Sequence, residues 1–182
     1  MEHSILVVLS PGFEEVEAIT VIDLLRRAKI KVTTASLEDA RTVMGSHGIF
    51  VTADMTLKEA ETLAFTGIVL PGGMRGVENM LENEMLLDIV RRYHDTGKVT
   101  AAVCAAPLVL DKLGMLKGIH FTCHPCVHDR IQQEGLEMTP SCTAGNIVTG
   151  RSAGCAMPWA LELIKKLLGE IPEPVLTGLR LP

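Results

Sequence analysis

Short apolar runs alternate with amphipathic stretches along most of the chain. Runs of aliphatic and β-branched residues without polar interruption are typical of buried strands. They occur at residues 5–9, 30–35, 67–70 and 99–103. Apolar residues at helical spacing predict helices. These lie at residues 13–28, 76–96 (in two pieces), 105–113 and 156–168.

The remaining segments are shorter or mixed. A hairpin is expected at residues 43–51 and a short helix at residues 55–63, while residues 118–150 mix short elements. The segment from residue 170 holds three prolines and predicts an extended or loosely packed arm. The alternation of strands and helices predicts an α/β fold with a mostly parallel sheet covered on both faces, in one domain spanning residues 1–182.

In such a sheet, ligands bind outside the carboxyl ends of the strands. The run AAVCAAP at residues 101–107 places Cys104 where a strand passes directly into a helix. Small neighbours permit a sharp turn that exposes the thiol, as in a nucleophile elbow. A helix that begins just after the cysteine is expected to lower the thiol pKa. The alternative is an inert cysteine at a buried strand end.

Two glycines, Gly72 and Gly73, follow another predicted core strand. Glycine lets the backbone approach a ligand closely, so the N–H groups here are candidates for an anion hole near Cys104. A plain tight turn is the alternative. A phosphate-binding loop is disfavoured because no Gly-Lys-Ser/Thr sequence follows.

Three acidic residues lie early in the first predicted helix, where the helix dipole favours them. Helical phase separates two of them: Glu15 shares a face with Arg26 and is expected to be solvated, whereas Glu17 falls within an apolar stripe. A carboxyl on a core-facing stripe is costly unless it is protonated or paired. Glu17 is therefore a candidate for a raised pKa and a role in proton transfer.

Residues 120–128 contain Cys123, His124 and Cys126 in a Cys-x-x-Cys arrangement. This spacing invites a zinc hypothesis, but a second ligand pair at finger spacing is missing. A catalytic histidine beside Cys104 is the favoured use of His124, and a partly exposed loop histidine is the alternative. His47 has no motif context and is interpreted as a surface residue.

The composition narrows the class of protein further. The net charge of −5 and the lack of clustered Lys and Arg argue against nucleic-acid partners. Neither a signal-peptide pattern nor an apolar run of about 18 residues is found, so no membrane partner and a cytoplasmic location are expected. Five cysteines form an odd set, which argues against a disulfide framework.

Taken together, the motifs resemble the ThiJ/PfpI superfamily, specifically its DJ-one branch. They occur in the family's order and cover nearly the whole chain. Unusually for this family, Cys123 and Cys126 flank His124. The segments that carry the resemblance are PGFEEVE (11–17), DLLRRA (23–28), LPGG (70–73), AAVCAAP (101–107), TCHP (122–125) and TGRS (149–152).

The resemblance implies a flavodoxin-like three-layer sandwich that forms a homodimer and needs no cofactor or metal. It implies a nucleophilic and redox-sensitive thiol at Cys104, a protonated carboxyl at Glu17 and a nearby histidine at His124. The backbone of Gly73 and Ala105, beside Gly72, resembles the family's oxyanion hole. Arg151 matches an arginine near the site.

The resemblance also implies activity as a cofactor-independent glyoxalase or deglycase acting on glyoxal or methylglyoxal. A cysteine-based oxidative-stress sensor or redox-regulated chaperone is the first alternative. A cysteine peptidase or amidase is a weaker one, because no histidine directly follows Cys104.

Overall fold

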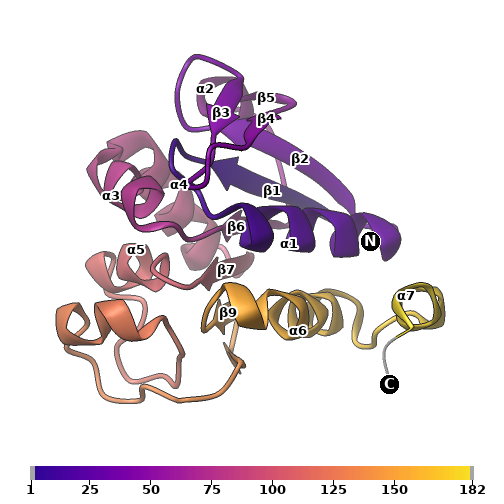
Figure 1. Cartoon of the computed structure of the whole chain (residues 1–182). Helices are drawn as coiled ribbons and strands as arrows, with labels where there is room; N and C mark the ends of the chain where they lie inside the picture. Colours follow the sequence, from indigo (N-terminus) through magenta and orange to yellow (C-terminus); the bar gives the residue numbers. More distant parts are fainter. Residues whose placement is uncertain (1–2, 181–182) are drawn as a thin grey trace.

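The fold is built around one seven-stranded sheet (Figure 1). The computed structural model describes residues 3–180. The strand order is β5-β2-β1-β6-β7-β9-β8, and every pairing is parallel except that of β8 with β9. The strands are β1 (Ser4–Leu9), β2 (Lys31–Ser36), β5 (Met55–Thr56), β6 (Gly67–Leu70), β7 (Val99–Val103), β8 (Ser141–Ala144) and β9 (Ile147–Gly150).

Helices cover both faces of the sheet, which confirms the expected flavodoxin-like α/β sandwich (Figure 1). One face is covered by α1 (Glu15–Arg27), α6 (Ala156–Leu168) and α7 (Glu173–Leu179). The other is covered by α2 (Leu57–Ala60), α3 (Met74–Glu82), α4 (Glu84–Asp95) and α5 (Pro107–Lys112). The remaining elements are the hairpin of β3 (Thr42–Met44) with β4 (Phe50–Thr52) and the 3-10 helices η1 (Pro125–Arg130) and η2 (Ala153–Cys155).

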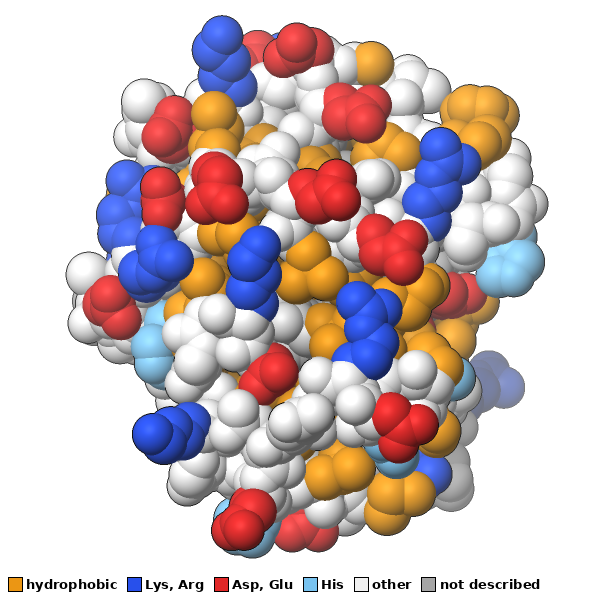
Figure 2. All heavy atoms as spheres, turned by 90° about the vertical axis from the view of Figure 1, so that its left-hand side faces the viewer, with side chains coloured by type: hydrophobic (Ala, Val, Ile, Leu, Met, Phe, Trp, Pro, Cys, Tyr) orange, Lys and Arg blue, Asp and Glu red, His pale blue; other side chains and the backbone are white. Residues whose placement is uncertain are grey.

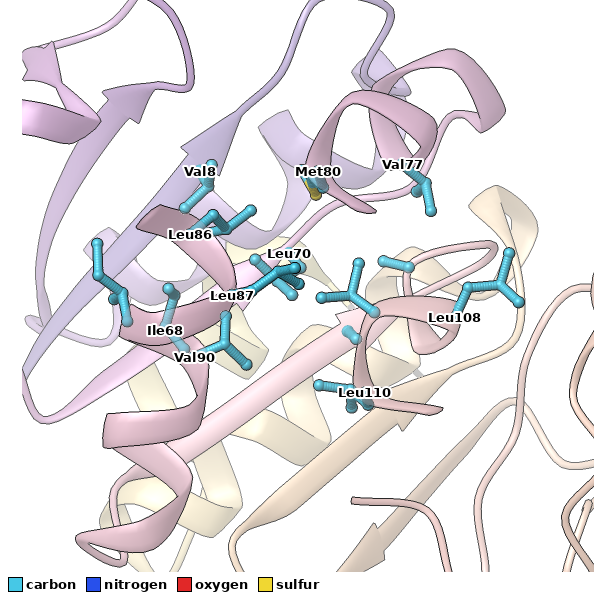
Figure 3. Close-up of a cluster of buried hydrophobic side chains, with 14 of the residues drawn as sticks. Val8, Ile68, Leu70, Val77, Met80, Leu86, Leu87, Val90, Leu108 and Leu110 are labelled. Atoms are coloured by element: carbon cyan, nitrogen blue, oxygen red, sulfur yellow. The ribbon is translucent and has the colours of Figure 1, made fainter. Parts of the chain in front are cut away.

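Alternation along the central strands feeds two hydrophobic cores. In β1, Leu6 and Val8 join the cluster under α3, α4 and α5, while their neighbours Ile5 and Val7 join the cluster under α1 and α6. Because successive strand side chains point to opposite faces, an unbroken apolar run fills both cores. Figure 3 shows part of the first cluster, where Val8 lies on the same side of the sheet as side chains of β6, α3 and α4.

Two predictions about local structure were wrong. The segment expected as one short helix at residues 55–63 begins with a strand, β5, and only then turns into α2, because Thr56 caps that helix with a capping box to Glu59. The arm expected from residue 170 contains the helix α7. Pro174 fits the first helical turn, and the fully buried Val175 holds the helix against the core.

The strand order places three unusual strand ends side by side. Chain order reverses between β1 and β6, and β7 follows next in the sheet. The carboxyl ends of these three parallel strands lead into Ser10, Pro71 and Cys104. Ligands in open α/β sheets bind at such a switch point, so the topology gathers the candidate residues at one edge.

No helix within residues 3–180 has the length and apolar character needed to cross a membrane. Figure 2 shows acidic and basic side chains interspersed over the face that it presents.

Candidate active site

Cys104 occupies a strained turn between β7 and α5. Its φ of 62° lies in the left-handed region, which a non-glycine residue seldom adopts. Two backbone hydrogen bonds hold the turn: the Cys104 N–H donates to the Gly150 carbonyl at 2.9 Å, and the His124 N–H donates to the Cys104 carbonyl at 2.8 Å. The thiol is half-buried. This geometry is that of the nucleophile elbow that the sequence predicted.

The carboxyl of Glu17 lies against the same turn. Glu17 is 0% exposed, and its Oε2 accepts a hydrogen bond from the Gly72 N–H at 2.7 Å. A Cβ added to Gly72 would lie 2.5 Å from Glu17 Oε2 and 2.6 Å from Cys104 Cβ, so both side chains meet above this glycine. Gly72 was predicted to be an oxyanion donor, but its N–H is already used to position Glu17.

The second carboxyl oxygen of Glu17 is left for the thiol. Oε1 is buried without a well-directed donor among residues 3–180, and Cys104 is the side chain close enough to supply one. Burial raises the pKa of Glu17 to about 7, although hydrogen bonds from Cys104 and Gly72 lower it in part. The carboxyl therefore exchanges its proton near neutral pH. A raised pKa was expected from the position of Glu17 within an apolar stripe of the helix.

The pKa of Cys104 moves in the direction opposite to the expectation from the helix dipole. Burial is the largest cause and raises the thiol pKa, and the charge of Glu17 raises it further. The helix α5 begins only at Pro107, three residues beyond Cys104, and spans six residues. The dipole effect falls off within one turn, so burial and Glu17 dominate. The thiol and carboxyl consequently titrate as a coupled pair.

Two backbone N–H groups point at the sulfur. Hydrogen bonds from Gly73 and Ala105 lower the pKa of Cys104, against the larger effect of burial. Gly73 has a φ of 90°, and a Cβ there would collide with the Gly12 carbonyl. Only glycine fits this close approach, which brings the Gly73 N–H to the thiol. A role for these two donors as an oxyanion hole stays a prediction.

His124 is joined to the elbow through its backbone. Its backbone N–H donates a hydrogen bond to the Cys104 carbonyl, and its ring Nδ1 accepts a hydrogen bond from the Cys126 N–H at 3.1 Å. The side chain is half-buried, and Nε2 is the ring atom that remains for other partners. A role for His124 in proton transfer stays a prediction.

Arg151 follows the strand β9 and lies next to Gly150, whose carbonyl accepts from Cys104. Its guanidinium donates to the Met138 carbonyl at 3.1 Å, and its backbone N–H donates to the Pro140 carbonyl at 3.0 Å. The side chain thus ties down the loop before β8. Contact of Arg151 with a substrate stays a prediction.

Glu15 is a second buried carboxylate, which its position in the sequence did not reveal. Glu15, expected to be solvated, is 5% exposed. It accepts hydrogen bonds from the His47 N–H at 2.6 Å and from the Ser46 hydroxyl at 2.9 Å, and His47 Nδ1 lies 2.9 Å from Glu15 Oε2. Burial raises the pKa of Glu15, but these hydrogen bonds outweigh it and lower the pKa to about 2. The exposed His47 ring covers this carboxylate.

The position of Glu15 along its helix did not reveal these hydrogen bonds, because their donors lie in the β3–β4 turn. The β3–β4 turn folds back onto the start of α1, where the Ser46 N–H donates to the Phe13 carbonyl at 2.8 Å. Glu14 caps the same helix end by accepting from the Glu17 N–H at 2.8 Å. The cap and the buried Glu15 fix the first turn of α1, and with it the direction of Glu17.

The chain is similar in sequence to several known proteins. Protein dj-1beta of Drosophila melanogaster is 36% identical over 172 residues, which cover 93% of this chain and 92% of that protein. The deglycase TK1284 of Thermococcus kodakarensis is 30% identical over 165 residues, covering 90% and 98%. Protein DJ-1 homolog B of Arabidopsis thaliana is 34% identical over 166 residues, and this chain spans only 38% of its length.

Solved structures agree with this comparison. The crystal structure of Drosophila melanogaster DJ-1beta superposes with a TM-score of 0.94 at 35% identity and covers 100% of both chains. A DJ-1 superfamily protein from Salmonella typhimurium gives a TM-score of 0.93 at 33% identity and covers 99% of both. The sequence pattern of the DJ-1/PfpI family matches residues 3–166. The chain belongs to the DJ-1/PfpI family.

Proposed function

We propose that the protein is a cofactor-independent glyoxalase or deglycase-type enzyme that acts on glyoxal or methylglyoxal through Cys104. The observation that carries the proposal is the pairing of the strained Cys104 thiol with the fully buried Glu17 carboxyl across Gly72. A nucleophile beside a group that exchanges protons near neutral pH is the arrangement that such chemistry needs. Similarity to a deglycase adds support.

The first step joins the thiol to the aldehyde carbon of methylglyoxal. As the S–C bond forms, the Cys104 proton passes to the ionised Glu17 carboxylate and then to the aldehyde oxygen, which gives a hemithioacetal. The Gly73 and Ala105 N–H groups beside the sulfur stabilise the negative charge that develops on that oxygen. The raised pKa of the thiol makes this proton acceptor necessary, because little thiolate exists beforehand.

The second step moves a hydrogen between the two substrate carbons. The Glu17 carboxylate removes the proton from the carbon bound to sulfur and returns it to the former ketone carbon, with His124 as a second carrier. The product is a lactoyl thioester. Water then cleaves the S–C bond, giving lactate and the free thiol. Near neutral pH a group with a pKa of about 7 can act as base and as acid in turn.

Methylglyoxal turnover by Cys104→Ser tests the proposal. Lactate formation should fall to the uncatalysed level in this variant, whereas Cys142→Ser, matched in chemistry and half-buried in β8, should keep the activity of the parent protein. Circular dichroism of each variant should match the spectrum of the parent protein, as a check that both are folded. Lactate formation that persists in Cys104→Ser would overturn the proposal.

A role as an oxidative-stress sensor is the second candidate function. The half-buried Cys104 thiol lies beside a carboxyl that can donate a hydrogen bond to an oxidised sulfur. Two equivalents of hydrogen peroxide would convert the thiol to the sulfinic acid and yield two waters. The tryptic peptide 99–112 holds Cys104 as its only cysteine, so it should be the first to gain two oxygens. Oxidation of other cysteines first would contradict this role.

We propose further that two copies of the chain pair through α1 and the β3–β4 hairpin. Large apolar side chains are exposed here, with Phe50 64%, Ile49 56% and Val16 54% exposed. They lie together because the hairpin packs on the start of α1 through Glu15. An exposed cluster of this kind is typical of an interface between proteins.

A further inference from the structure

The pair Cys123 and Cys126 lies beside the Cys104 elbow and has no part in the proposed chemistry. Cys123 is 1% exposed and packs in the hydrophobic cluster under α5, while Cys126 is exposed at the start of η1. Both thiols are free. The chain turns between them at His124 and Pro125, so one thiol faces the interior of the protein and the other faces solvent.

Cys123 and Cys126 lie at the two ends of one tight turn. Burial raises the pKa of Cys123 to about 11, and the neighbouring Cys126 contributes to the increase. The turn is tight: the Val127 N–H donates to the His124 carbonyl at 3.0 Å, and the Cys126 N–H donates to the ring of His124. Two cysteines separated by two residues in a turn have the spacing found in Cys-x-x-Cys motifs that carry out thiol–disulfide exchange.

A zinc site is not favoured by the same residues. Within residues 3–180, the side chains that bring three ligand atoms together are Glu14, Glu15 and His47, away from this pair. Cys123 and Cys126 therefore lack the third and fourth ligands that a structural zinc ion needs. Simple packing accounts for the buried Cys123 but leaves the exposed Cys126 without a structural role.

We propose that Cys123 and Cys126 form a dithiol–disulfide centre that reacts with small disulfides. The Cys126 thiolate attacks one sulfur of the small disulfide, whose S–S bond breaks and releases one thiol. Cys123 then attacks the Cys126 sulfur, the mixed disulfide breaks, and the Cys123 proton passes to the departing small thiolate, which leaves as the second small thiol. Two cysteine thiols are oxidised by two electrons, and the small disulfide is reduced to two thiols.

Burial fixes the order of the two steps. A small disulfide in solution reaches the exposed Cys126, whereas Cys123 is covered by the core and reacts only with its neighbour. The centre is also linked to the elbow, because the Cys126 N–H holds the His124 ring and the His124 N–H bonds the Cys104 carbonyl. Closing the disulfide displaces the Cys126 N–H and changes the surroundings of His124.

Mass spectrometry after treatment with oxidised glutathione tests the proposal. The protein carries Cys104→Ala so that this thiol cannot relay the oxidation. The tryptic peptide 118–130 contains Cys123 and Cys126 and no other cysteine. With both cysteines present, this peptide should lose two hydrogens and carry no lasting glutathione. A reductant should restore its mass.

Single variants then separate the two roles. Cys123→Ala should accumulate glutathione on Cys126, because nothing displaces it, and Cys126→Ser should leave Cys123 unmodified. Cys142→Ser is the matched control and should behave like its parent. If Cys123→Ala does not fold, Cys123→Val fills the same apolar site. A lasting adduct on Cys126 with Cys123 present, or an unreacted peptide, would overturn the proposal.

Nuclear magnetic resonance of the His124 ring gives a readout independent of activity. Oxidation should shift its resonances, and a reductant should reverse the shift. The same treatment should leave these resonances unchanged in Cys126→Ser. Unchanged His124 resonances in a protein whose peptide 118–130 has lost two hydrogens would contradict the link to the elbow.

Discussion

The Glu17 carboxyl and the Cys104 thiol meet above Gly72, whose missing side chain leaves room for both. The Gly72 N–H also holds Glu17 Oε2 at 2.7 Å, so the same glycine spaces and orients the pair. The strained backbone of Cys104 points the thiol to this place. The thiol and the carboxyl thus form one unit whose protons are exchanged together.

Replacement of Gly72 by alanine tests this spacing. The added methyl group would meet Glu17 Oε2 and Cys104 Cβ at 2.5 and 2.6 Å, so one side chain must move. Misplacement by about 1 Å costs a reaction about 100-fold in rate, and we expect methylglyoxal turnover to fall by about that factor.

Gly154→Ala is the matched control for this substitution. A Cβ at Gly154 has only the Ser152 hydroxyl within reach, at 3.9 Å, and the position needs no positive φ. This variant should keep full turnover. Equal activity of Gly72→Ala and Gly154→Ala would contradict the proposed geometry.

Glu17→Gln should stabilise the protein at alkaline pH. The pKa of Glu17 in the folded state, about 7, lies above its ordinary value of 4.5. The folded state therefore holds this proton more tightly, and the free energy of unfolding falls as pH rises between these two values. Glutamine carries no charge, so the variant avoids this loss. Its free energy of unfolding should exceed that of the parent by up to about 3 kcal/mol at about pH 8.

Urea unfolding of both proteins across this pH range measures the difference. The gain from Glu17→Gln should disappear below the ordinary carboxyl pKa, where Glu17 is protonated in both states. Glu38→Gln, at an exposed position, is the control and should change stability little. A constant difference between Glu17→Gln and the parent at every pH would argue against the raised pKa.

Glu15→Gln should have the opposite dependence on pH. The pKa of Glu15 is lowered to about 2, so its carboxylate stabilises the fold above 4.5, and this contribution is lost as pH falls toward 2. We expect the variant to lose about 1–2 kcal/mol near neutral pH, discounted for the nearby solvent. The loss should vanish in acid. Denaturant unfolding near neutral pH and in acid measures this difference. An equal loss of stability under both conditions would show that the effect comes from packing alone.

Phe50→Glu should separate the proposed pair of protomers. Phe50 is the most exposed large hydrophobic residue within residues 3–180. A charge there would be buried without a partner in the interface. Light scattering coupled to gel filtration should give twice the chain mass for the parent and the chain mass for the variant. Leu63→Glu, at another exposed apolar position, is the control. A monomeric parent protein would refute the proposed pairing.

The sequence predicted the parts of the fold and site that depend on local pattern. The apolar run of β1 and the passage from strand to helix at Cys104 are visible in a few consecutive residues. The spacing of apolar residues in the first helix was enough to place Glu17 on its buried face. These features could be predicted because period and turn chemistry act over short distances.

Contacts between distant segments could not be predicted in this way. Glu15 is buried by Ser46 and His47, about 30 residues away, so its helical phase gave the wrong environment. The pKa of Cys104 depends on burial and on Glu17 more than on its own helix. Val175 buries a helix in a segment whose prolines suggested an arm. In each case tertiary packing overrode the local signal.

The pairing of Glu17 with Cys104 can be tested by titrating the Glu17 carboxyl with carbon-13 nuclear magnetic resonance, in the presence and absence of the neighbouring thiol. In the parent protein we expect a midpoint near pH 7. In Cys104→Ala the midpoint should rise, because the hydrogen bond from the thiol, which lowers the pKa of Glu17, is lost. A midpoint near 4.5, or one that does not respond to removal of the thiol, would contradict the claim that the two groups act as a pair.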